Sequence, residues 1–193
     1  MLADPWLQRW LPLVVERAGA APVLELGCGH GDDSVVLAAA GLDLVALDIS
    51  ADDVAAARLR APNARFLVQD VREPFPLGAG GAGVVVASLS LHYFPFAQTQ
   101  ELVERIRQTL GPGGLLLCRL NSSNDHNYGA SGHAEIERHY HSVKGQGKYF
   151  FDQGDIERLF ATGWRRLGCE ERVTRKYGKP KSLWEVVLEK EGD

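Results

Sequence analysis

Cysteine is scarce in this sequence of 193 residues, which has three: Cys28, Cys118 and Cys169. The number is odd, and the three are spaced neither as a CxxC pair nor as a metal site. This scarcity argues against a disulfide scaffold and against a structural zinc site. We therefore predict three reduced thiols, no bound metal and a cytoplasmic location.

Basic residues are also fewer than acidic ones. The sequence has 21 Lys and Arg residues and 25 Asp and Glu residues, which give a formal net charge of -4. A protein that binds nucleic acid over a wide face needs a basic surplus, so nucleic acid is not the favoured partner. The opening residues, MLADPWLQRW, lack the basic start and the apolar run of a secretory signal. No apolar stretch is long enough to span a bilayer, and we expect no membrane partner.

The sequence does contain an alternation of short apolar runs and amphipathic segments, which is typical of βαβ units. We predict strands at 21–26, 42–48, 65–69, 83–89 and 115–120. Helices are predicted at 5–18, 32–40, 50–60 and about 102–110. After a polar, irregular segment at 121–150, a helix opened by Asp152 or Asp155 leads to two strands, at 164–176 and 182–190.

The segment Glu25–Gly31, ELGCGHG, follows the first predicted strand and precedes a helix. Its glycines permit positive φ and a close backbone approach to a ligand, and the helix start offers free N–H groups. A dinucleotide fingerprint needs glycine or alanine at the sixth position from Gly27, where this sequence has Asp32. An acid there repels a pyrophosphate but suits a ligand with a cationic amino or sulfonium group, as does Glu25.

ELGCGHG resembles the E/D-x-G-x-G-x-G first motif of class I S-adenosylmethionine-dependent methyltransferases, and further motifs extend the resemblance over residues 20–120. The resemblance implies an α/β fold: a Rossmann-like, seven-stranded, mostly parallel sheet with the last strand antiparallel and helices on both faces. The chain length fits one domain, so we expect a single methyltransferase domain over residues 1–193, with a cofactor-binding core at 20–120, an acceptor-side insertion at 121–151 and a helix and strand pair at 152–193. The implied cofactor is S-adenosylmethionine, and its product is S-adenosylhomocysteine.

The same resemblance assigns roles to the acids after the next two strands. Asp48, followed by Ile49, lies where the family places an acid on the ribose hydroxyls, and a carboxylate can accept from two adjacent hydroxyls. Asp70 is implied to accept from the adenine amino group, and the Val71 N–H to reach a ring nitrogen. Taken singly, each acid is also compatible with a surface position or a turn cap. The implied cofactor-binding residues are Glu25, Gly27, Cys28, Gly29, Gly31, Asp48, Ile49, Asp70, Val71, Ser88 and Leu89.

The chain departs from the family at Ala82-Gly83, where an acid often begins the fourth strand. His92 and Tyr93, in SLSLHYF, follow that strand, where the methyl acceptor is expected. We take them as candidate catalytic residues, with His92 as a base or as a group that positions the acceptor. The alternative is a structural histidine that packs the loop.

The segment 121–151 holds further candidates for contacts with the acceptor, against the alternative of a surface loop with its own packing. These candidates are Asn121, Asn124, Asp125, Tyr128, Tyr140 and Tyr149. In the same segment, His139 and His141 would share one face of a strand, but no spacing matches a zinc site.

Basic residues cluster near the last turn: Arg172, Arg175, Lys176, Lys179 and Lys181. The turn lies at the ligand edge of the sheet if the preceding strand is parallel to the others. The cluster would then attract an anionic acceptor or a nucleic-acid phosphate. The favoured interpretation is a solvated hairpin whose charges protect an edge strand.

The sequence favours a methyltransferase that acts on a small molecule, since it shows no recognition domain and has an acidic net charge. It looks somewhat like the small tellurite-resistance-type and methyltransferase-domain-11 groups. Three alternatives remain. One is a tRNA or protein methyltransferase that uses the basic hairpin. Another is a nicotinamide oxidoreductase, against which Asp32 argues, and the third is a non-catalytic S-adenosylmethionine-binding protein.

Overall fold

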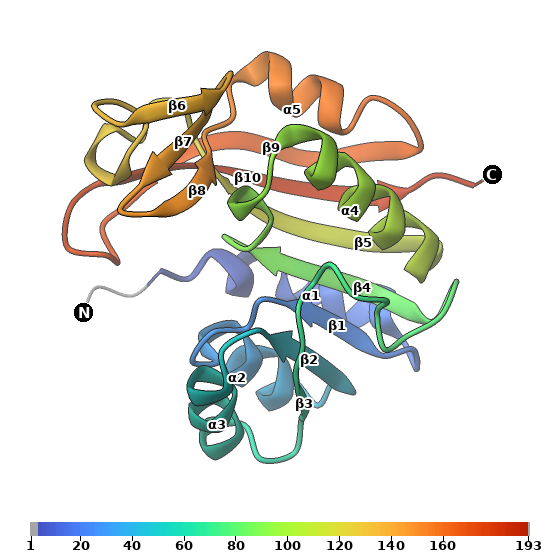
Figure 1. Ribbon diagram of the computed structural model, residues 1–193. Helices are drawn as coiled ribbons and strands as arrows, with labels where there is room; N and C mark the ends of the chain where they lie inside the picture. The colour runs from blue at the N-terminus through green and yellow to red at the C-terminus, as the bar shows by residue number, and fades with distance from the viewer. Residues whose placement is uncertain (1–3, 193) are drawn as a thin grey trace.

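A seven-stranded sheet forms the centre of the protein in a computed structural model that describes residues 4–192 (Figure 1). Its strands are β1 (Val23–Leu26), β2 (Leu44–Asp48), β3 (Arg65–Val68), β4 (Ala82–Ser88), β5 (Leu110–Asn121), β9 (Trp164–Thr174) and β10 (Lys181–Lys190). The helices are α1 (Trp6–Ala18), α2 (Asp32–Ala39), α3 (Ala51–Arg60), α4 (Phe96–Thr109) and α5 (Gln153–Leu159). Within residues 4–192, none of the helices has the length and apolar character needed to cross a membrane.

The predicted strands and helices are present, with two clear differences: α4 begins at Phe96, where the prediction was about 102, and β5 also begins early. This strand begins at Leu110, where the prediction was 115, because the backbone becomes extended directly after α4. The segment GPGG then forms an irregular part of the strand, with a shift of its register against β4.

The strands lie in the order β3-β2-β1-β4-β5-β10-β9. Neighbours from β3 to β5 pair in parallel, whereas β10 is antiparallel to both β5 and β9. β9 therefore points the same way as β5, and the last strand of the chain runs against the others. This confirms the expected Rossmann-like sheet with an antiparallel final strand.

Helices cover both faces of the parallel part of the sheet. Side chains alternate between the two faces of a strand, so successive residues of β4 pack against different helices. In β4, Val84 and Val86 pack in the apolar cluster that includes residues of α1, α2 and α3. Val85 and Ala87 pack in the cluster that includes residues of α4 and α5. The apolar run predicted as a doubly covered strand is accordingly buried from Ala82 to Ala87.

A second, three-stranded sheet lies between β5 and α5, so our prediction of an irregular segment at 121–150 is wrong. Its strands are β6 (Ala134–Glu137), β7 (Tyr140–Val143) and β8 (Gln146–Tyr149), which pair antiparallel in this order. All four residues of β6 are exposed, so it lacks the apolar alternation by which a strand is recognised in a sequence. Tyr149 and Phe151 anchor this small sheet in the main core.

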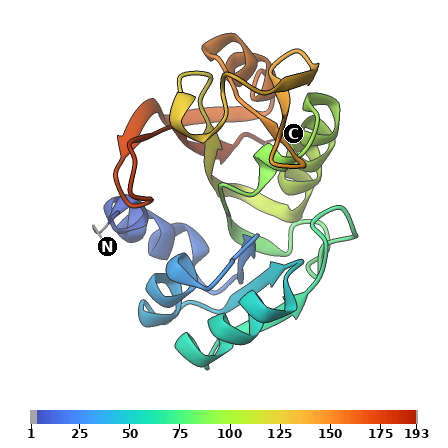
Figure 2. The ribbon, with the colours of Figure 1, turned by 60° about the vertical axis from the view of Figure 1, so that its left-hand side comes forward.

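The loops that can bind a ligand meet at one edge of the large sheet. The parallel strands end there, and the β6–β8 sheet follows the end of β5. The turn between β9 and β10 reaches the same edge because β9 is parallel to β5. Figure 1 shows the β6–β8 sheet and the β9–β10 turn on one side of the molecule, and Figure 2 shows α2 and α3 at the opposite end of the sheet from α5.

Candidate functional site

A cavity of about 730 Å³ opens at this edge, a volume typical of small-molecule sites. Its wall comes from the turn after β1, the ends of β2 and β3, the loop after β4, and side chains of β5, β8 and the β9–β10 turn. The carboxyl ends of parallel strands meet at one edge of a sheet, so residues far apart in the sequence share this wall.

The Gly-rich turn lies against the loop after β4 and is held by Asp48. Gly27 and Gly29 have positive φ angles of 74° and 50°, and a Cβ on Gly27 would lie 2.5 Å from the Cβ of Ser90. The Asp48 carboxylate accepts from the Gly29 N–H at 2.8 Å and from the Ser50 N–H at 2.9 Å. Asp48 thus fixes the turn and the start of α3, and its oxygens keep lone pairs for further donors.

The remaining residues of the motif differ in their positions. Cys28 lines the cavity, and burial raises the pKa of its thiol. Gly31 does not line the cavity: it caps α2 with a φ of 82°, and a Cβ there would lie 2.9 Å from the Cβ of Ala57 in α3. The structure therefore places Gly31 at a contact between two helices.

Glu25 and Asp33 make the cavity acidic beside the Gly-rich turn. Glu25 is 3% exposed and accepts a hydrogen bond of 2.5 Å from the Ser34 hydroxyl. Burial, and then the neighbouring Asp33 carboxylate, raise the pKa of Glu25 to about 8. Burial also raises the pKa of Asp33, which accepts from the Trp6 indole N–H at 2.9 Å. A positive ligand charge here would favour the ionised form of both acids.

Asp32 connects the Gly-rich segment to the β9–β10 turn. Lys176 Nζ lies 2.7 Å from one carboxylate oxygen of Asp32, and Arg60 Nη1 lies 2.6 Å from the other. Hydrogen bonds from Lys176 and Arg60 lower the pKa of Asp32 to about 2. Asp32, whose charge is unfavourable for a dinucleotide, therefore also joins the start of α2 to the β9–β10 turn.

The ends of β2 and β3 form another part of the wall. Ile49 is 68% exposed and lines the cavity, as does the buried Val71. Asp70 also lines it, and its two oxygens accept from the Arg72 guanidinium, with both Nε distances at 3.0 Å. This pairing lowers the pKa of Asp70. Arg72 itself lines the cavity, although the sequence analysis did not single it out.

The end of β4 contributes Ser88 and Leu89, which both line the cavity. The Ser88 hydroxyl accepts from Arg119 Nε at 2.9 Å, and Leu89 has a φ of 57°, which is uncommon for a residue with a side chain. Arg119 is 2% exposed, lies 2.5 Å from an Asp4 oxygen, and stacks 4.4 Å from the centre of the Trp6 ring. Its charge is therefore compensated within the protein.

The short helix η1 (Leu91–Tyr93) places His92 and Tyr93 on the cavity wall. His92 is 3% exposed, and its buried Nδ1 has no hydrogen-bond partner in the described part of the chain. Burial, and then the positive charges of Lys181 and Lys148, hold the pKa of His92 well below 6.5. A neutral imidazole at this position can accept a hydrogen bond or a proton.

Of the six acceptor candidates in the segment 121–151, Tyr128 lies on the cavity wall. Asn121 and Asp125 are buried outside this wall, and both accept from Lys181 Nζ, at 2.7 Å and 2.6 Å. They therefore act on the cavity through Lys181, which does line it.

The structure does not bring the other three candidates to the cavity: Asn124 donates to Glu171, Tyr140 donates to the Tyr93 carbonyl oxygen, and Tyr149 is buried in the core. Tyr140 and Tyr149 are partners across β7 and β8, so their side chains share one face of the small sheet. Lys148, the residue of β8 just before Tyr149, points to the opposite face and lines the cavity.

Sequence reasoning missed Lys148 because the strand that orients it was not predicted. It also missed Gln146 and Tyr177, which line the cavity from β8 and from the β9–β10 turn. The one available signal was a lysine next to the aromatic run Tyr149–Phe151 in a segment already suspected of facing the acceptor.

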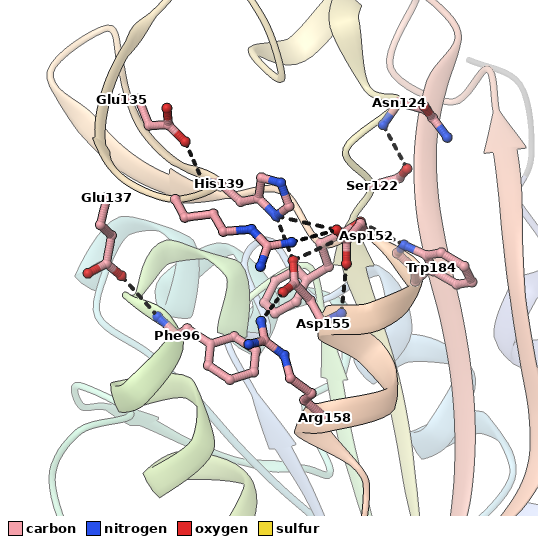
Figure 3. A network of polar contacts seen from close by, with 12 residues as sticks. Phe96, Ser122, Asn124, Glu135, Glu137, His139, Asp152, Asp155, Arg158 and Trp184 are labelled. Carbon is pink, nitrogen blue, oxygen red and sulfur yellow. Dashed lines mark hydrogen bonds and ion pairs between the residues drawn. The ribbon is translucent and has the colours of Figure 1, made fainter.

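Figure 3 shows a polar cluster where the β6–β7 turn meets α5, in which His139, Asp152 and Asp155 place ligand-type atoms within 4.8 Å of one another. His139 lies between β6 and β7 with a φ of 63°, whereas His141 lies within β7. Our expectation that these two histidines share one strand face is therefore wrong.

Other partners already occupy the carboxylates of this cluster. Asp152 accepts from Arg138 at 3.1 Å, and Asp155 accepts from Arg158 and contacts His139 at 2.7 Å. The two acids also form the capping box of α5, which agrees with the predicted helix start. We interpret the cluster as a fastening of the β6–β8 sheet to α5, and the absence of a metal stays a prediction.

Comparisons with known proteins agree with this geometry. A family model described as a methyltransferase domain matches residues 23–114. An uncharacterised methyltransferase from Synechocystis is 34% identical over 111 residues, which are 56% of this chain and 52% of that protein. Trans-aconitate 2-methyltransferase from Delftia acidovorans is 32% identical over 109 residues, 55% of this chain and 40% of that protein. The chain thus spans about half the length of the curated relatives it matches.

Solved structures match along the whole chain. A SAM-dependent methyltransferase from Methanosarcina mazei has a TM-score of 0.77 at 14% identity and covers 100% of both chains. The 1,6-didemethyltoxoflavin-N1-methyltransferase from Burkholderia thailandensis has a TM-score of 0.72 at 19% identity, over 97% of this chain and 79% of that one. At such identities the likeness shows the fold alone. The domain model, the relatives and the fold therefore agree: residues 23–114 match a methyltransferase domain, and the chain has the fold of the S-adenosylmethionine-dependent methyltransferases.

Proposed function

We propose that this chain is an S-adenosylmethionine-dependent methyltransferase that acts on a small molecule. The observation that carries the proposal is the division of one cavity into two halves. Beside the Gly-rich turn and the end of β2 its lining is acidic, whereas beside η1, β8 and the β9–β10 turn it is aromatic and basic. The acidic half suits a cofactor with a sulfonium and an ammonium group, and the other half is left for the acceptor.

The groups of the acidic half fit S-adenosylmethionine. In this proposal the free lone pairs of Asp48 accept from two adjacent ribose hydroxyls, and Asp70 with the Val71 N–H binds the adenine edge. Glu25 and Asp33 stabilise the positive charge of the cofactor. The hydroxyl of Ser90, on the same wall, is buried and has no hydrogen-bond partner within residues 4–192, which also supports a ligand here.

Bound S-adenosylmethionine supplies an electrophilic methyl group, and in-line transfer of it needs mainly proximity and alignment. In the proposed mechanism His92 takes the proton that the acceptor atom loses, or orients that atom by a hydrogen bond. The low pKa of His92 supports this role because the imidazole is neutral before the reaction. Tyr93 and Tyr128 form the aromatic wall that holds the acceptor.

A small-molecule acceptor is favoured over tRNA or protein. Three residues of the basic cluster are ion-paired: Lys176 with Asp32, Lys181 with Asp125, and Arg172 with Glu170. Among the described residues, this leaves Arg175 and Lys179 without an ion pair, too few for a phosphate-binding face. Several relatives are named for small molecules, such as the ubiquinone biosynthesis O-methyltransferase from Cronobacter sakazakii. A single domain over residues 1–193 and a cytoplasmic location remain predictions.

Titration calorimetry tests whether the protein binds the proposed cofactor. We expect S-adenosylmethionine and S-adenosylhomocysteine to bind and NAD not to bind. Asp48→Ala should weaken binding about 10- to 100-fold, the effect of losing hydrogen bonds to a charged group. Asp43→Ala, which removes an exposed acid outside the cavity, is the matched control and should bind normally. Binding of NAD in place of the sulfonium cofactor would refute the proposal.

A labelled-methyl transfer screen tests turnover and the acceptor class. Pools of small metabolites, RNA and protein are incubated with the enzyme and labelled cofactor. We expect label in the metabolite pool, whereas label in RNA would favour the tRNA alternative. Cofactor binding without transfer to any pool would favour a non-catalytic binding protein.

A further inference from the structure

Four cationic side chains line the acceptor half of the cavity, and they differ in how their charge is compensated. Three have a carboxylate within 2.7 Å: Lys176 with Asp32, Lys181 with Asp125, and Arg119 with Asp4. The side chain of Lys148 has neither an ion pair nor a hydrogen bond to any residue in the range 4–192. The Lys148 ammonium group lies over the ring of Tyr93, whose centre is 5.8 Å from Lys148 Nζ.

The position of Lys148 makes this lack of a partner costly. The side chain is half-buried, and burial lowers the pKa of its ammonium group, an effect that the Asp125 carboxylate, which already pairs with Lys181, only partly offsets. Removing a charge from water without a counter-ion is unfavourable. Ionisable groups whose pKa is shifted by burial concentrate at functional sites. Because the core-facing Tyr149 precludes rotation of the strand, Lys148 stays at the wall of the cavity. An incoming anion would supply the missing partner.

The groups around Lys148 indicate which kind of anionic ligand would fit the cavity. Tyr93, Tyr128 and Tyr177 give the same wall three aromatic rings, which favour contact with a planar molecule. One unpaired ammonium matches one negative charge. A carboxylate meets this condition better than a phosphate, which carries more charge and needs more donors.

We propose that Lys148 is a specificity-determining residue that pairs with the carboxylate of a planar, aromatic small-molecule acceptor. This inference rests on the proposed methyltransferase function, since it assumes that the acidic half of the cavity holds the cofactor. It names the chemical class of the acceptor for the same site.

Calorimetry on protein saturated with S-adenosylhomocysteine tests the pairing, with 4-hydroxybenzoate and its neutral analogue 4-hydroxybenzamide as probes. We expect the acid to bind about 10- to 100-fold more tightly than the amide, the range for a charge-assisted hydrogen bond. Lys148→Met should abolish this preference, and Lys148→Arg should retain it. Lys179→Met removes an equal charge outside the cavity and should also retain it.

Three results would overturn the inference: equal binding of acid and amide, binding of neither, or a preference that survives in Lys148→Met. Inorganic phosphate that binds as tightly as the acid would overturn the carboxylate assignment. S-adenosylhomocysteine is titrated alone into each variant first. If the wild type does not bind it, the proposed function fails. If all variants bind it and thermal unfolding shows them folded, failure of the acid preference concerns Lys148 alone.

Discussion

A buried acid beside the Gly-rich turn makes the stability of this protein depend on pH. A glutamate exposed to water ionises near pH 4.5, but the pKa of Glu25 in the fold is about 8, because burial and Asp33 disfavour its charge. Between these pH values the folded protein holds a proton that the unfolded chain has lost. The free energy of unfolding therefore decreases as the pH rises through this range.

We predict that Glu25→Gln, which cannot ionise, is more stable than the wild type above pH 8, and that its advantage shrinks towards pH 4.5. The gain at high pH should exceed about 1 kcal/mol, which corresponds to about 2–4 °C in Tm for a chain of this size. Thermal unfolding without ligand measures it, with the exposed Glu101→Gln as control. A Tm difference that does not change with pH would contradict the assignment of the raised pKa to Glu25.

The surroundings of His92 lower its pKa, whereas those of Glu25 raise the pKa of that residue. In both cases the neutral form of the side chain is favoured. Burial acts first, followed by Lys181 and Lys148, and the Tyr93 ring lies with its centre 4.3 Å from that of the imidazole. Since the pKa of His92 lies well below 6.5, the imidazole is neutral at pH 6.5 and above. A base of this kind stops working only when the pH falls through its own pKa.

We predict that kcat/KM for the acceptor found in the transfer screen does not decline until the pH is well below 6.5. His92→Gln should lower kcat by about 10²- to 10⁴-fold, the usual contribution of a general base. Its affinity for S-adenosylhomocysteine should match that of the wild type. An unchanged kcat in His92→Gln would show that the residue only packs the loop.

Among the elements, α2 and α3 owe their close contact to a glycine of the motif. Gly31 has a φ of 82°, and a Cβ there would lie 2.9 Å from the Cβ of Ala57. Gly41, after α2, has a similar φ of 77° but open space around it. The two glycines therefore separate the cost of backbone strain from the cost of a steric clash.

We predict that Gly31→Ala destabilises the protein more than Gly41→Ala. Both should lose about 1 kcal/mol to the positive φ, and Gly31→Ala should lose a further 1–3 kcal/mol or so by overpacking. Denaturant unfolding measures both, and Ala57→Gly should partly rescue Gly31→Ala. Equal losses in the two single variants would mean that the helices move apart freely.

Elements with a strong apolar pattern were predictable, and those without one were not. β4 is buried from Ala82 to Ala87, and its valine run predicted a strand covered on both faces. β6 has four exposed residues, so its pairing with β7 depends on hydrogen bonds that leave no periodic trace in the sequence. The missed sheet is the one that carries Lys148 into the cavity.

At the scale of the whole molecule, the pair Lys176–Asp32 joins the last turn of the chain to the first loop. Its 2.7 Å distance links the β9–β10 turn to the start of α2, beside the proposed cofactor. A ligand bound at the Gly-rich turn should therefore also order the β9–β10 turn. Such a ligand at about 100 times its Kd stabilises the fold by about 2.7 kcal/mol.

We predict that S-adenosylhomocysteine slows amide hydrogen exchange in two segments, 25–33 and 175–180. In Lys176→Met the second segment should lose its protection while the first keeps it. Lys179→Met, which leaves the ion pair intact, should behave like the wild type. Protection of 175–180 that persists in Lys176→Met would show that the ligand reaches this turn by another route.

The sequence by itself determined the fold class and the location of the acidic half of the cavity. Consecutive parallel strands bring their carboxyl ends to one edge, so Glu25, Asp48 and Asp70 converge there whatever the details of packing. Only the tertiary structure decided the acceptor half. Which face of β8 Lys148 occupies, and which carboxylates compensate Lys176 and Lys181, depend on contacts between distant segments. Such contacts leave no local pattern in a sequence, because each side chain is placed by the packing of its neighbours in space.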